Sequence, residues 1–259
     1  MGPKGKASLA MDAWAELYEA PTAMAADWGH HRIYAPAAYK IIRTLPLVPI
    51  VYTEVLNLAP LFPTCWAMMD HEPTLCVLRS LLGDGLGMPG GVKAATALLP
   101  LAFQAYPIVV PYEHSPDSQP IVVDRTIADD PTDIGAPLMM SDGQLAKATQ
   151  IRSRTALQAG RMLPATRAIS RYLFESGLLE PWPLQFDLGA GITVDINHLK
   201  VLSYSRLDDP QIYTAISRFG VDAALFLSAS RLSLFRTARL LSAAKAACQT
   251  ATSPHATAA

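Results

Sequence analysis

The chain has 259 residues, of which 51% are hydrophobic and 17% charged, with a mean hydropathy of +0.21 and a formal net charge of −1 at pH 7. This length and apolar content are enough to bury a sizeable core, which excludes global disorder. No apolar run reaches the roughly 18 residues of a membrane-spanning helix, and a nearly neutral chain without interleaved aromatic residues does not favour nucleic-acid binding.

The N-terminal segment predicts a helix and not an export signal. Residues 1–20 contain two lysines but no continuous apolar stretch, and acidic residues stand where a signal peptide is still hydrophobic. The pattern over residues 8–20 predicts a short helix ended by Pro21. Because no secretory signal is found and the three cysteines have no close pairing, the simplest compartment is the reducing cytoplasm. We expect a soluble cytoplasmic protein with no transmembrane segment.

Proline recurs every few residues through the apolar stretch from Leu45 to Pro111. Each proline removes a backbone donor and fixes φ, so it occupies a strand edge, a first helical turn or a bend. This part of the chain is therefore expected to consist of short pieces. They are one or two helical turns over Glu54–Ala59, two strands over Phe62–Met69 and Pro73–Leu82, and an antiparallel pair over Ile108–Tyr112 and Ile121–Arg125.

From Ser141 onward the pattern becomes mainly helical. Ser141 or Asp142 is expected to cap a long helix, which Pro164 kinks or divides and Gly177 ends. The segment FDLGAGITVDI then predicts a hairpin.

The last segment, Pro210–Cys248, has the pattern of two helices. Leu227, Leu234, Ala238 and Leu241 fall on one helix face, and we expect this amphipathic face to close the core.

These elements predict an α+β fold, with antiparallel strands mainly in the first half and helices concentrated after residue 141. We expect a single domain over residues 1–250, followed by a disordered Ala-, Thr- and Ser-rich tail over residues 251–259. Charge differs between the halves: residues 1–140 hold 8 Lys and Arg against 14 Asp and Glu, while residues 141–259 hold 13 against 8. The simplest interpretation is solvated helix faces in the second half, and the alternative is that the charges orient the two halves toward each other or toward a partner.

Two familiar kinds of active site are not favoured by the sequence. There is no G-x-S-x-G elbow, and Cys65, Cys76 and Cys248 lack a context that lowers a thiol pKa, so they are expected to be small buried hydrophobes. Residues 85–90 spell a dinucleotide fingerprint, but Pro89 stands where backbone donors are needed and no clear strand precedes it. We therefore expect a flexible loop there and no cofactor.

Histidines offer one candidate site. His30, His31 and His71, together with a nearby acid, are residue types that can hold a divalent metal. No metal-binding spacing is present, so ordinary loop histidines are the simpler interpretation.

Arginines offer a second candidate. Arg154 and Arg161 are seven residues apart, and Arg167 and Arg171 are four apart, so each pair is expected to share a helix face. Such a face can meet a phosphate or carboxylate, or simply face solvent.

Several segments occur in an order that is similar to one bacterial family. They are HHRIYAP, PLVPIVYTEVLNLAPLFPTCW, LCVLRSLLGDGLG, LLPLAFQAYPIVV, VDINHLKVL and FLSASRLSLFRTARLL. The most telling positions are Pro49 with Glu54 and Phe62-Pro63, the Ala105-Tyr106-Pro107 element, and Leu232-Ser233-Leu234. Together they resemble the SapC family, and not the transporter permease of the same name. The segment DGLGMPGGVKAAT departs from the family's usual Asn-Leu-Phe and Gly-Arg-Trp pieces.

The resemblance implies a surface-layer-associated (S-layer) protein without an established set of catalytic residues. We therefore expect a non-enzymatic accessory or binding protein that engages a protein or peptide partner linked to the cell envelope, and homo-oligomerisation stays open. The residues expected to bind are Trp66, Tyr106, Arg154 and Arg161. One alternative is a metal-dependent enzyme acting on a peptide or small molecule through the three histidines; another is a small-molecule binding module with a pocket near Trp66 and Tyr106.

Overall fold

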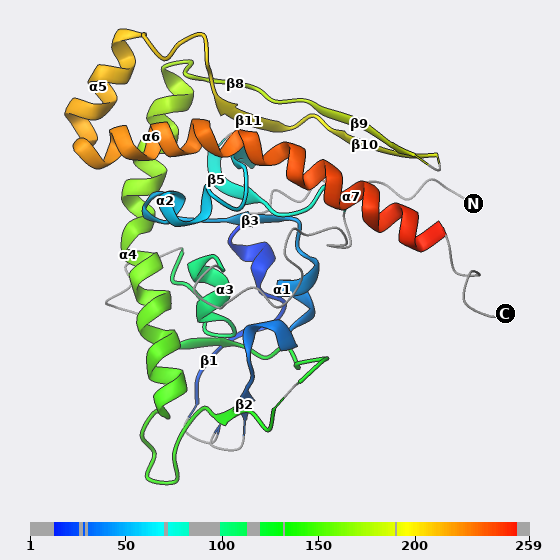
Figure 1. Ribbon diagram of the computed structural model, residues 1–259. Helices are drawn as coiled ribbons and strands as arrows, with labels where there is room; N and C mark the ends of the chain where they lie inside the picture. The colour runs from blue at the N-terminus through cyan, green and yellow to red at the C-terminus, as the bar shows by residue number, and fades with distance from the viewer. Residues whose placement is uncertain are drawn as a thin grey trace, which may run out of the picture.

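The computed structural model describes residues 13–25, 28, 31–69, 72–82, 99–112, 120–131, 133–189 and 191–252. At its centre is a five-stranded antiparallel sheet with the strand order β3-β5-β4-β11-β8 (Figure 1). The strands are β3 (Leu47–Pro49), β4 (Thr64–Met69), β5 (Glu72–Leu78), β8 (Leu179–Pro181) and β11 (Leu199–Leu202). Because β11 pairs with β4, the sheet joins the two halves of the chain.

Both faces of this sheet are buried. Successive side chains of a strand point to opposite faces, so Trp66 and Leu75 belong to one face while Cys65 and Cys76 belong to the other. The first face packs into the larger hydrophobic cluster and the second into a smaller one. Near-continuous apolar strand sequences are the consequence of this double burial.

Helices α4 (Lys147–Glu175) and α6 (Val221–Ser233) cover the first face. The indole of Trp66 donates to Ser170 Oγ on α4 at 3.0 Å, and its ring lies edge-on to Phe226 of α6. The backbone N–H of Thr64 donates to Ser233 Oγ at the end of α6. In Figure 1, α4 runs along one side of the molecule, and α6 crosses over the sheet.

Helix α7 (Thr237–Thr252) and the hairpin of β9 (Leu184–Gly189) and β10 (Ile192–Ile196) cover the second face (Figure 1). The buried positions of α7 are Leu240, Ala244 and Cys248. They recur every four residues, so they form one stripe along the helix.

The remaining elements of the first half pack mainly around α3 (Leu101–Ala105), which lies against α4, while α2 (Val55–Leu58) packs against α6. Two small antiparallel pairs join distant segments: β1 (Pro21–Ala23) with β6 (Val122–Asp124), and β2 (Arg32–Ile33) with β7 (Ala136–Pro137). The other helical pieces are η1 (Ala15–Leu17), η3 (Pro36–Ala38), α1 (Lys40–Thr44) and η4 (Tyr52–Glu54).

The predicted fold class is confirmed: the structure is α+β, and its helices are concentrated late in the chain. The predicted strands over Phe62–Met69 and Pro73–Leu82 correspond to β4 and β5. The predicted pairing of residues 108–112 with 121–125 exists only as a bridge between Ile108 and Val123, and beyond it the N–H of Val110 donates to the hydroxyl of Tyr18. The other edge of β6 pairs with β1. In the described part of residues 8–20, only η1 is helical.

Helix α4 is not divided, and it begins later than predicted. Helix α4 runs unbroken through Pro164, whose ring lies on the exposed side while Leu163 anchors the opposite face in the core. The cap residue is Ala146, and Asp142 instead accepts the N–H of Gln144 in the preceding turn. Gly177, with φ +66°, ends the helix as predicted.

The C-terminal segment folds as three long helices instead of two. Helix α5 (Pro210–Phe219) is separated from α6 by Gly220, whose φ is +85°, and the short η7 (Leu234–Arg236) joins α6 to α7. The buried face of α7 differs from the predicted core face: Ala238, which was predicted to lie on that face, is exposed, whereas Leu240 is fully buried. Helix α7 also extends through Thr252, two residues into the expected tail, and residues 253–259 lie outside the described part.

Candidate functional site

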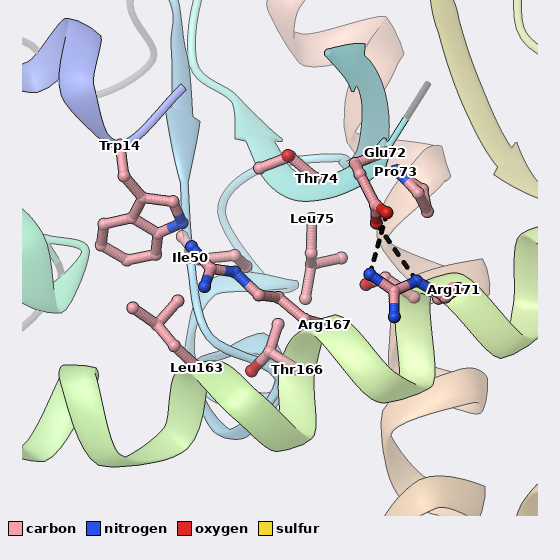
Figure 2. Close-up of a pocket in the computed structure, with 11 residues that line it drawn as sticks. Trp14, Ile50, Glu72, Pro73, Thr74, Leu75, Leu163, Thr166, Arg167 and Arg171 are labelled. Atoms are coloured by element: carbon pink, nitrogen blue, oxygen red, sulfur yellow. Dashed lines mark hydrogen bonds and ion pairs between the residues drawn. The ribbon is translucent and has the colours of Figure 1, made fainter. Parts of the chain in front are cut away.

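A cleft of about 330 Å³ opens between α4 and the first half of β5 (Figure 2). Its lining combines charged groups at the rim with hydroxyl and apolar groups below. The lining residues are Trp14, Ile50, Glu72, Pro73, Thr74, Leu75, Leu163, Thr166, Arg167, Ser170 and Arg171.

Helix α4 supplies five of these residues from a single face. Leu163, Thr166, Arg167, Ser170 and Arg171 follow the i, i+3, i+4, i+7, i+8 spacing that places side chains together on a helix. Leu163, Thr166 and Ser170 are buried, whereas both arginines are exposed. The helix therefore presents cationic groups above a buried base.

The opposite wall exists because β3 is shorter than β5. The last backbone hydrogen bond on that side runs from Ile50 N–H to Leu75 O at 3.0 Å, and the chain then turns into η4. There the N–H of Tyr52 donates to Thr166 Oγ1 on α4. Pro73 has no N–H to offer an additional strand. The start of β5 is therefore left facing α4 across the cleft.

The two arginines of the cleft have different partners. Arg171 makes a two-point contact with Glu72, with Nε 3.3 Å from Oε2 and Nη2 2.8 Å from Oε1. Both side chains are about half exposed, at 52% and 55%, so this ion pair contributes little to stability. Arg167 extends away from this pair toward Trp14 (Figure 2), and its Nη2 donates to Tyr112 O at 2.8 Å. Two guanidinium groups against one carboxylate give the described lining an excess positive charge.

The two hydroxyl groups beneath the arginines hold the framework together. Thr166 Oγ1 donates to Met162 O and accepts from the N–H of Tyr52, and Ser170 Oγ accepts the indole N–H of Trp66. None of the lining residues is a histidine or cysteine. The groups that line the cleft are therefore suited to binding an anion above an apolar floor.

The residues predicted to bind occupy different places. Trp66 is fully buried and reaches the cleft only through Ser170. Tyr106 is also buried, in another part of the core, where its hydroxyl donates to Asp124 Oδ2 at 3.0 Å. Arg154 and Arg161 are exposed on α4 but do not line the cleft. The structure does not bring these four residues together.

The predicted metal-binding set is only partly described. His31 stacks against Trp28 with ring centroids 4.9 Å apart, whereas His30 and His71 lie outside the described residues. Within the described ranges, no group of three or more His, Cys, Asp or Glu side chains is placed to hold a metal ion. The glycine segment over residues 85–90 also lies outside them.

The cysteines behave as small hydrophobes, as predicted. All three are buried, and burial strongly raises the pKa of the Cys65 thiol. A thiol with a raised pKa is a poor nucleophile.

A buried carboxylate stands near the cleft but does not line it. Glu54 accepts the N–H of Val51 through Oε2 at 2.8 Å and the N–H of Leu101 through Oε1 at 2.6 Å. Burial raises its pKa to about 7. Glu54 thus connects η4, which positions Tyr52 against α4, with α3.

Sequence reasoning identified two of the residues that line the cleft, Arg167 and Arg171. The four-residue spacing of Arg167 and Arg171 predicted a shared face, which the structure confirms. Glu72 and Trp14 were missed, because Glu72 lies 99 residues from Arg171 and Trp14 lies still farther from α4 in the chain, so no local spacing connects them.

The SapC family model matches residues 25–213. The chain belongs to the SapC family. The matched segment contains all of the cleft lining except Trp14, and it ends before α6. No curated protein matches the SapC-family chain, and no solved structure does. Among the described residues, no helix combines the length and apolar character needed to cross a membrane.

Proposed function

We propose that this SapC-family protein is a non-enzymatic accessory protein that binds a carboxylate group of a protein or peptide partner in the α4–β5 cleft. The observation that carries the proposal is the pair Arg167 and Arg171 above an apolar floor of Ile50, Leu75 and Leu163. Arginine presents a planar fork of donors that matches a carboxylate, and its excess over acidic groups favours an anion.

The size and depth of the cleft favour a short segment of a partner. Its volume of about 330 Å³ is at the lower end for ligand pockets, which suits a chain terminus or one to two residues. An apolar residue next to a carboxylate would place its side chain against Leu75 while the carboxylate meets the arginines. A C-terminal leucine has this chemistry.

The cellular setting is proposed from the family resemblance. Because the resemblance implies a surface-layer association, we favour a partner that is connected with the cell envelope. A cytoplasmic location for the protein itself is part of the same proposal.

The proposal is tested with acetyl-Ala-Ala-Leu and its C-terminal amide as probes, titrated into the full chain by calorimetry. We expect the free carboxylate to bind measurably more tightly than the amide. Arg167→Gln and Arg171→Gln should each weaken binding by about two- to fivefold, the range of exposed charge contacts. Arg154→Gln and Arg161→Gln are matched controls on the same helix, since they do not line the cleft. Equal affinity for acid and amide, or equal losses in all four variants, would contradict the proposal.

A further inference from the structure

A second concave surface lies at the opposite part of the fold from the small β pairs, where α5, α6 and η7 meet the segment after β11. It is an apolar groove of about 770 Å³. We call it the α6 groove; its lining residues are Tyr204, Leu207, Ile212, Ile216, Ala224, Leu227, Ser228, Arg231, Leu232, Leu234 and Phe235. Figure 1 shows α5 and α6 side by side at this corner, with α7 continuing from α6.

Helix α6 carries more apolar surface than its own core contacts use. Its inner face, which includes Ala223 and Phe226, is buried against the sheet. Leu232 and Phe235 lie outside that face and are 63% and 80% exposed, and Tyr204 across the groove is 69% exposed. A contiguous apolar surface of this kind marks an interaction site more often than a free surface.

We propose that the α6 groove binds an acidic amphipathic helix of a partner protein. The lining from Ala224 to Phe235 follows a single stripe of about three helical turns, roughly 16 Å long. Its walls are helices and the turn after β11, with no open strand edge among the lining residues, so an occupant must satisfy its own backbone hydrogen bonds. A helix that inserts apolar side chains at i, i+3, i+4 and i+7 meets this requirement.

Charge complementarity favours an acidic helix. Arg231 is the only charged residue among the lining residues, and its guanidinium lies 5.2 Å from the centre of the Tyr204 ring. Its Nη1 donates to Leu202 O at 3.1 Å and lies 4.0 Å from Glu180 Oε1, outside the lining, at the limit of an ion pair between two partly exposed side chains. Arg239 follows Phe235 by four residues and is exposed, so it extends the same stripe by one turn. Residues 204–252 contain six Lys and Arg against three Asp and Glu.

The same charges disfavour two other occupants. A second copy of this chain in a two-fold arrangement would bring Arg231 and Arg239 of both copies into one interface, where their like charges repel. The C-terminal residues 253–259, SPHATAA, contain no acidic residue and no large apolar side chain. Neither fits a groove that is both apolar and positively charged.

The test uses two fluorescein-labelled, end-capped 15-residue peptides and the full-length protein. Both carry leucine at the i, i+3, i+4, i+7 and i+11 positions; one has glutamate at its polar positions and the twin has lysine. Glutamate and lysine have similar helix propensities, so the peptides differ mainly in charge. By fluorescence anisotropy we expect the glutamate peptide to bind saturably and about tenfold more tightly than its twin, with affinity falling as salt rises.

Two exposed apolar residues give matched variants. Phe235→Ser should abolish saturable binding, whereas Ile127→Ser, at a residue that is 86% exposed and far along the chain, should leave it unchanged. Arg239→Gln should reduce the difference between the two peptides. Equal binding of both peptides, full binding by Phe235→Ser, or absence of binding would overturn the proposal. A dimer in sedimentation velocity that Phe235→Ser dissociates would also overturn it, in favour of a second copy as the occupant.

Discussion

Replacing the buried carboxyl group of Glu54 with an amide should change how the stability of the protein depends on pH. Glu54 is only 7% exposed, and its two oxygens accept the N–H groups of Val51 and Leu101. Burial raises its pKa to about 7, against an ordinary value of 4.5. The folded state therefore binds a proton at a pH where the unfolded chain has already released it.

The sign and size of the effect follow from that difference. Between pH 4.5 and 7 the folded protein carries more protons than the unfolded chain, so stability falls as pH rises. The contribution of Glu54 is fully present below its unfolded pKa and is lost as pH rises through about 7. A shift of this size corresponds to about 3 kcal/mol across the whole window.

The variant Glu54→Gln separates this term from all other titrations. An amide has one acceptor oxygen, so it satisfies one of the two N–H groups and leaves the other unpaired, at a cost of about 1–3 kcal/mol near pH 5. The contribution of this amide to stability does not change with pH, because the amide does not titrate. The difference in unfolding free energy between wild type and variant, measured by urea denaturation, should therefore shrink between pH 5 and 8. A constant difference over this range would refute the reasoning.

Three further predictions concern the core, one helix contact and metals. Leu240→Ala, at a fully buried position of α7, should lower the unfolding free energy by about 2–5 kcal/mol. Ala238→Ser, at an exposed position of the same helix, should lower it by less than about 0.5 kcal/mol. Similar losses for the two variants in chemical denaturation would contradict the burial of α7. Gly160→Ala should destabilise the fold by about 1–3 kcal/mol although alanine has the better helix propensity, because the alanine Cβ would lie 2.6 Å from the Pro111 ring. A raised melting temperature would show that Gly160 and Pro111 are not in tight contact. Elemental analysis of the purified protein should find no stoichiometric metal, and a chelator should leave peptide binding unchanged; one metal ion per chain with chelator-sensitive binding would support the histidine-based enzyme instead.

Local pattern was sufficient for the elements whose partners are close in sequence. The hairpin of β4 and β5 was predictable because two apolar runs of strand length flank a short turn. The shared face of Arg167 and Arg171 followed from helical spacing alone. The end of α4 at Gly177 followed from the left-handed conformation that glycine adopts readily.

Contacts between distant segments were not predictable from local pattern. The pairing of Lys200 with Trp66 joins residues far apart in sequence, and nothing near either residue specifies it. The buried face of α7 was misplaced because Leu240 and Leu241 are equally apolar, and only the position of the sheet decides between them. Trp66 and Tyr106 were expected at a binding surface, but their polar atoms are used inside the core, by Ser170 and Asp124.

The most direct test of the proposed function is a double-mutant cycle that combines Arg167→Gln with the change from the carboxylate to the amide of acetyl-Ala-Ala-Leu. If the guanidinium of Arg167 meets the carboxylate, the two changes should be coupled by about 0.5–1.5 kcal/mol in binding free energy. The same cycle built on Arg154→Gln should give a coupling near zero. A coupling near zero at Arg167, or one of equal size at Arg154, would contradict the assignment of the α4–β5 cleft as the binding site.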